Sequence, residues 1–133
     1  MRNFDNDMLS VITAFEKVTG SEVRDCIFSD VVYFLLNPGK IAQTIGKNGK
    51  NIKTAEKMLG KPIKVFEWAD NDMDLIKNMI GRTVKIELKE EKATVTISQE
   101  DRGAIIGKEG GNIKAIRELL NRNSNIKELK ILP

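Results

Sequence analysis

Ile45-Gly46-Lys47-Asn48-Gly49-Lys50-Asn51-Ile52-Lys53 sets the organisation of this 133-residue chain, because a second copy follows it. The copy, Ile106-Gly107-Lys108-Glu109-Gly110-Gly111-Asn112-Ile113-Lys114, begins 61 residues later, and both fit the pattern I-G-K-x-G-x-N-I-K. A pattern that recurs at a distance indicates repeated structural units. We therefore expect two units, residues 1–69 and 70–133, each of roughly 65 residues and each presenting one glycine loop.

The chemistry of the repeated stretch suits a phosphate chain. Glycine has no Cβ, so the backbone at Gly46 and Gly49 can come close to a partner. A lysine stands at the tip, beside the start of an expected helix, and helix N-termini attract anions. Residues 40–64 hold seven lysines and one acid, a net charge of +6 that is typical of a polyanion-binding surface. Two plainer interpretations stay open, namely a solvated lysine face and a tight helix–helix turn without a ligand.

Hydrophobic periodicity and turn residues predict the same order of elements in both halves. In the first half we expect helices over 4–18, 39–45 and 50–59 and strands over 23–28, 31–36 and 63–68. In the second half we expect a helix ending at Gly81, helices over 100–106 and 111–121, and strands over 83–89, 92–98 and 126–132. The strand over 31–36 is nearly all apolar, so it should be central and buried on both faces.

The sequence also predicts helix caps, inward-facing residues and the environment of the single cysteine. Asn3 or Asp5 should cap the first helix, Asp70 or Asp72 the helix that opens the second half, and Pro38 should stand in the first turn of the helix over 39–45. The residues expected to face inward include Ile52, Ala55, Met58 and Leu59 in one helix and Val84, Ile86 and Leu88 in one strand. Cys26 should be a small core residue in a reducing compartment.

These elements predict an α+β fold. In each half the strand before the pair of helices and the strand after it should be parallel, joined by a right-handed crossover. The helices would then cover one face of a three-stranded mixed sheet. The boundary at residues 69–72 holds no Gly, Pro or Ser, so we expect a short, stiff junction between the halves.

Several kinds of catalytic or cofactor site are excluded. The P-loop needs G-x-x-x-x-G-K-[S/T], but Asn48 stands where Ser or Thr should follow Gly46-Lys47, and the dinucleotide fingerprint G-x-G-x-x-G is absent. A chain without histidine and with one cysteine lacks the ligands of a zinc site and the usual base for a serine or cysteine nucleophile. We therefore expect no enzyme, no cofactor and no metal. No apolar run approaches the roughly 20 residues that span a membrane.

The arrangement of a helix, I-G-x-x-G-x-x-I and a second helix resembles the K-homology (KH) RNA-binding module, whose GXXG loop clamps the backbone of about four nucleotides. The order α-β-β-α-α-β resembles the type II form of that module, so the resemblance implies two tandem type II KH domains. It implies RNA contacts from Gly46, Lys47, Asn48, Gly49, Lys50, Lys53, Gly107, Lys108, Glu109, Gly110 and Lys114. Bases would lie in a groove with Ile41, Ile45, Ile105 and Ile106 on its floor, whereas Ile52 and Ile113 are interpreted as core. Glu109 would repel a phosphate, so the second loop is expected to bind more weakly.

Two KH modules in tight tandem resemble the archaeal NusA-like transcription factors. That resemblance implies a cytoplasmic monomer that binds nascent single-stranded RNA and affects transcription termination or antitermination. The bacterial relatives carry further domains that this sequence does not show, so contact with RNA polymerase stays open. A ribosome-associated or ribosome-assembly protein is the alternative, and an accessory module of an RNA-processing enzyme is a third hypothesis.

Overall fold

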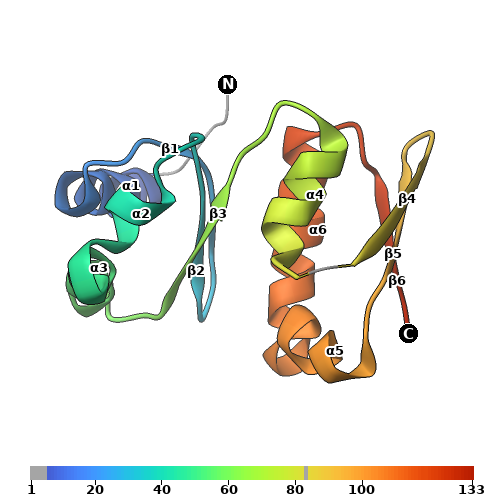
Figure 1. The fold of residues 1–133 in the computed structure, drawn as a ribbon. Helices are drawn as coiled ribbons and strands as arrows, with labels where there is room; N and C mark the ends of the chain where they lie inside the picture. Colours follow the sequence, from blue (N-terminus) through green and yellow to red (C-terminus); the bar gives the residue numbers. More distant parts are fainter. Residues whose placement is uncertain (1–5, 83) are drawn as a thin grey trace. The chain divides into compact units, whose positions relative to one another are not determined.

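The computed structural model describes residues 6–82 and 84–133 (Figure 1). Contacts divide the chain into two compact units, one reaching to Trp68 and one beginning at Ala69. The expected cap residues Asn3 and Asp5 lie outside the described residues. Among the helices that the structure describes, none has both the length and the apolar character needed to cross a bilayer.

The first unit consists of helices and a small mixed sheet. Its elements in chain order are α1 (Asn6–Thr19), β1 (Val23–Phe28), β2 (Val32–Leu36), α2 (Ile41–Ile45), α3 (Lys50–Leu59) and β3 (Ile63–Glu67). Strand β2 is central, antiparallel to β1 and parallel to β3. All five of its residues are buried, as their apolar character predicts.

The second unit repeats this order. Its elements are α4 (Asp72–Ile80), β4 (Lys85–Lys89), β5 (Lys92–Thr96), α5 (Gln99–Ile106), α6 (Gly111–Asn123) and β6 (Glu128–Leu132). Strand β5 is central, antiparallel to β4 and parallel to β6. The α+β class, the three-stranded mixed sheets and the parallel pairs are therefore confirmed in both units.

The core of the first unit lies between the sheet and its helices. Phe15 of α1 stacks on Phe34 of β2, with ring centroids 3.8 Å apart, and Ala55 of α3 is fully buried beside them. Cys26 belongs to the same cluster at 1% exposure, as expected. The inward face of α6 is likewise buried, including Ile113, Ile116, Leu119 and Leu120.

Four local predictions are wrong. Met58 is 53% exposed, because it lies at the outer edge of the apolar face of α3. Leu88 is 38% exposed, since β4 pairs on one side only and lies at the edge of its sheet. Helix α2 begins at Ile41 rather than at 39, because Gly39 takes a left-handed φ of 80° and Pro38 falls in the turn before it. Asn71, not Asp70 or Asp72, caps α4 by accepting a hydrogen bond from the Asp74 N–H.

Candidate nucleic-acid interface

The two glycine loops have almost the same backbone geometry. In each, a short helix ends at a glycine, a single 3₁₀ turn follows (Lys47–Gly49 and Lys108–Gly110), and a longer helix begins at once. The first glycines, Gly46 and Gly107, both have φ 78°, with ψ 172° and 175°. The tip residues Asn48 and Glu109 are left-handed at φ 57° and 55°. The shared sequence pattern therefore corresponds to a shared conformation.

The first glycine of each loop is required by packing inside the protein. A Cβ on Gly46 would lie 2.8 Å from Asn51 Cγ, and a Cβ on Gly107 would lie 2.7 Å from Asn112 Cβ. Their φ and ψ values also fall in a region that is essentially restricted to glycine. The lack of a side chain at this position thus lets the two helices of each loop meet closely.

The second glycine of each loop has space beside it. A Cβ on Gly49 would meet only ordinary van der Waals neighbours, the nearest being Lys53 Cε at 3.6 Å. A Cβ on Gly110 would meet no atom within 4 Å. Glycine is favoured here because φ is 73° and 74°, and its small size leaves the backbone open to a partner from outside.

An asparagine at the start of the second helix fastens each loop. Asn51 Nδ2 donates to the Gln43 carbonyl at 3.0 Å, and the buried Asn112 Nδ2 donates to the Ile105 carbonyl at 2.7 Å. These bonds join the helix after the loop to the last turn of the helix before it. Sequence reasoning missed this positioning role, although the asparagine is part of the repeated pattern.

Helix α2 of the first unit is anchored to the end of α1. The Thr44 hydroxyl donates to Ser21 Oγ at 2.6 Å, and Gln43 Nε2 donates to the Gly20 carbonyl at 2.7 Å. Thr44 is fully buried, so this anchor is part of the packed interior. The first loop is thereby held against the connection between α1 and β1.

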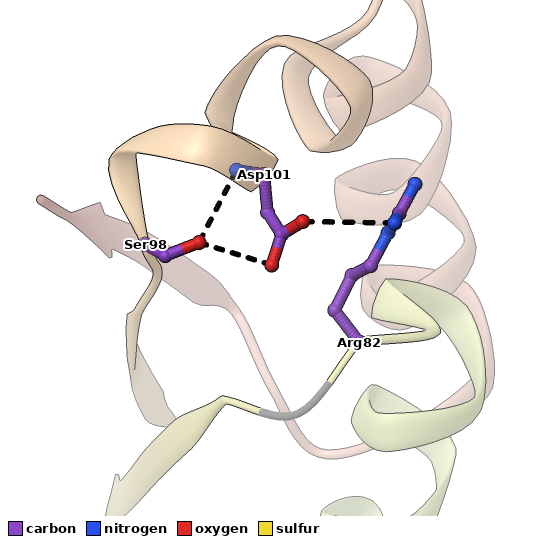
Figure 2. A network of polar contacts seen from close by, with 3 residues as sticks. All are labelled: Arg82, Ser98 and Asp101. Carbon is purple, nitrogen blue, oxygen red and sulfur yellow. Dashed lines mark hydrogen bonds and ion pairs between the residues drawn. The ribbon is translucent and has the colours of Figure 1, made fainter.

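Helix α5 of the second unit is held by a different set of polar contacts (Figure 2). Ser98 caps it, with Oγ accepting from the Asp101 N–H at 3.2 Å and donating to the Asp101 carboxylate at 3.0 Å. Arg82, just after α4, lies 3.6 Å from the same carboxylate. An acid in the first turn also complements the helix dipole. Both loops are thus tied to the end of the first helix of their own unit, through different residues.

The predicted phosphate-contacting side chains are at the surface. Lys47 and Asn48 form the exposed tip of the first loop, and Lys108 and Glu109 that of the second. Lys50, Lys53 and Lys114 are exposed on the following helices. Within residues 6–82 and 84–133, no ion pair joins any of these lysines to an acid, so their charges face solvent.

The four isoleucines predicted to line a groove differ in their surroundings. Ile45 is 37% exposed, and Ile106, at the matching position of the second loop, is half-buried. Ile41 is half-buried and packs against the core of the first unit. Ile105 is only 2% exposed, so it offers almost no surface to a base and belongs to the interior.

The loop tips differ in charge and in conformational cost. Asparagine tolerates the left-handed region because its short amide can bond locally, whereas glutamate at φ 55° has no such advantage. Glu109 also places a negative charge where Asn48 is neutral. The tip of the first loop therefore carries no negative charge, whereas the tip of the second loop carries one.

Comparison with known proteins identifies relatives of this chain. A KH-domain family model matches residues 74–131. The "Probable transcription termination protein NusA" of Methanocaldococcus jannaschii is 30% identical over 125 residues, covering 89% of this chain and 68% of the relative. Its namesake from Halococcus morrhuae is 30% identical over 126 residues, covering 90% and 91%.

Two further matches extend the comparison. The "RNA-binding protein KhpA" of Chlamydia caviae is 44% identical over 52 residues, which is 35% of this chain and 67% of that protein. A solved structure, "Crystal structure of APE1850", is similar with a TM-score of 0.74 and 26% identity, covering 96% of this chain and 99% of that one. The chain thus shares its fold with that structure over nearly the full length of both chains.

Proposed function

The chain belongs to the archaeal NusA-like family and contains a KH domain, and from this premise we propose that it binds single-stranded RNA and acts in transcription termination. The name "transcription termination protein" belongs to the relatives, and the relationship over most of the chain supports carrying it over. The observation that carries the RNA-binding part is the pair of matched loops, each with open space at its second glycine and exposed lysines around it.

We propose that residues 1–69 form a second KH domain in addition to that of residues 70–133. The family model matches only the second unit, but the first has the same order of elements, the same sheet topology and the same loop dihedral angles. Both domains would be of type II. Once one RNA strand is bound by the loop of one unit, the loop of the other unit would meet the same strand at a high effective concentration.

In the proposed mechanism the loop binds the sugar–phosphate backbone. The first N–H groups of the 3₁₀ turn have no partner within that turn, and the helix that follows presents the positive end of its dipole. A strand passing Gly49 would meet these groups and the ammonium of Lys47 together. Lys50 and Lys53, one and two turns along, would contact flanking phosphates. Such contacts raise affinity without selecting a sequence.

Base recognition is assigned to the surface beside each loop. Ile45 is the most exposed of the predicted groove isoleucines and would provide apolar contact for a base next to the first loop. Ile106 would do the same beside the second loop, and Ile41 would support the floor. RNA would bind more tightly at the first loop than at the second, because Glu109 repels phosphate at the second loop.

Fluorescence anisotropy with a labelled single-stranded RNA tests the proposal. We expect saturable binding whose affinity falls with salt, with a slope of about −2 to −3 in log K against log salt concentration if three or four phosphates are contacted. Double-stranded RNA of the same composition should bind more weakly, because a clamp needs an unpaired strand. The absence of saturable binding at low salt would contradict the proposal. Preferential binding to folded ribosomal RNA or co-sedimentation with ribosomal subunits would favour the ribosome-associated alternative.

A further inference from the structure

A basic groove runs along the outer side of α3 in the first unit. It is open to solvent, has a volume of about 700 Å³ and is lined by Lys53, Thr54, Glu56, Lys57, Gly60, Lys61 and Pro62. Lys50, Lys53 and Lys57 recur at intervals of three and four residues, so they share one stripe of the helix. That stripe begins beside the first glycine loop and ends at the groove.

The positive charge of this groove is not balanced by its one acid. Glu56 is half-buried, and its carboxylate accepts a hydrogen bond from the Ile63 N–H at 2.8 Å. The carboxylate therefore fastens α3 to β3. Over the described part of the chain, no ion pair joins Lys53, Lys57 or Lys61 to an acid. The groove thus presents three ammonium groups that complement a polyanion.

An exposed aromatic ring stands at the far end of the groove. Lys61 Nζ donates to the Ser29 carbonyl at 2.7 Å and lies 4.5 Å from the centre of the Phe28 ring. Phe28 is 44% exposed, whereas Phe15, Phe34, Phe66 and Tyr33 are at most 4% exposed. Single-stranded nucleic acids bind in positively charged grooves that hold aromatic side chains on which bases stack. Because the Lys61 ammonium lies over one face of the Phe28 ring, a base would take the part of the ring that stays exposed.

We propose that this groove is an accessory RNA site that takes the nucleotides flanking those held by the first loop. It rests on the proposed RNA binding and extends it beyond the loop. Lys53 and Lys57 hold phosphates of the strand as it leaves the loop, and a base stacks on the exposed surface of Phe28. The bound RNA is therefore longer than the roughly four nucleotides that one loop accommodates.

The second unit offers an internal comparison. Counting 61 residues along, Lys114 of α6 matches Lys53, but Glu118 takes the place of Lys57. The chain position matching Phe28 is Lys89, so the second unit has no aromatic ring there. The accessory site is accordingly assigned to the first unit alone.

Affinities for two single-stranded RNAs test this assignment in the full chain. One RNA has about four nucleotides, enough for the loop, and the other is about three times as long. We expect the variants Phe28→Leu and Lys57→Glu each to weaken binding of the longer RNA by about five- to tenfold and to change binding of the shorter one less than twofold. Leucine keeps an apolar side chain but removes the ring, and Lys77→Glu on α4 is the control for the same change in net charge.

A second measurement locates the base directly. After ultraviolet irradiation of the complex with the longer RNA, we expect a crosslinked peptide that contains Phe28. Failure of the unmodified chain to bind either RNA would overturn the proposed function and this inference together. If the unmodified chain binds both RNAs but neither groove variant affects the longer one more than Lys77→Glu does, the accessory site is refuted while the loop mechanism stands.

Discussion

Replacing both Lys47 and Asn48 by aspartate is expected to weaken RNA binding by about 100-fold or more, or about 2.7 kcal/mol of binding free energy. The double substitution removes one positive charge and adds two negative charges where we propose that a phosphate lies. Like charges brought together at an interface cost several kcal/mol. The fold should persist, because both side chains are exposed and aspartate tolerates the left-handed φ of 57° at position 48.

Circular dichroism combined with an RNA titration measures both parts of this expectation. The matched control is the double substitution of Lys108 and Glu109 by aspartate, which changes the second loop at the same two positions. Because Glu109 is already negative, this control should lose less affinity than the first-loop variant. A folded first-loop variant with unchanged affinity would refute the role of that loop.

Replacing Gly107 by alanine is expected to destabilise the second unit by about 2–6 kcal/mol. A backbone with φ 78° and ψ 175° costs an alanine about 1–3 kcal/mol, and the new Cβ would also lie 2.9 Å from the Asn112 backbone nitrogen. Overpacking of this kind typically adds 1–3 kcal/mol. Since a small domain has about 5–15 kcal/mol in total, much of this unit's stability would be lost.

The control for this prediction is Gly110→Ala in the same loop. Gly110 is left-handed at φ 74°, but no atom lies within 4 Å of an added Cβ, so only the backbone cost of about 1–2 kcal/mol applies. Urea denaturation followed by circular dichroism compares the two variants. Equal losses of stability would mean that the close approach of α5 and α6 at Gly107 is unimportant.

The two glycines of each loop therefore have different tasks. The first allows one helix to pass closely over the next, a need that exists with or without a ligand. The second glycine keeps the backbone accessible from outside. It is the position at which bound RNA would require a residue without a side chain. For the same loss of stability, substitution of the second glycine should accordingly cost more RNA affinity than substitution of the first.

The order of elements and the sheet topology were predictable from the sequence for identifiable reasons. The repeated pattern fixes the two loops, and the apolar run over 31–36 identifies the central strand. A parallel pair around two helices then follows from the rules of chain connection. Cys26 and Ile113 were predicted correctly as core residues, because both lie in apolar patterns whose burial follows simple periodicity.

Other features depend on tertiary contacts that local patterns do not contain. Thr44 and Ile105 occupy matching positions before the two loops, yet one anchors its helix through Ser21 while the other fills the core. The residue types differ, but the partner of Thr44 and the burial of Ile105 depend on tertiary contacts that the repeated pattern does not contain. The role of Asn51 and Asn112 likewise depends on carbonyl groups seven or eight residues away. Helix starts were missed where a turn residue, such as Pro38, also favours a helical first turn.

A crystal structure of the full chain with a short single-stranded oligoribonucleotide tests the central claim most directly. We predict that the sugar–phosphate backbone lies against Gly49 of the first loop, within hydrogen-bonding reach of Lys47 and of the N–H groups of the turn. We also predict that the contact of RNA with Gly110 is weaker or absent. RNA bound at a surface remote from both loops would contradict the account.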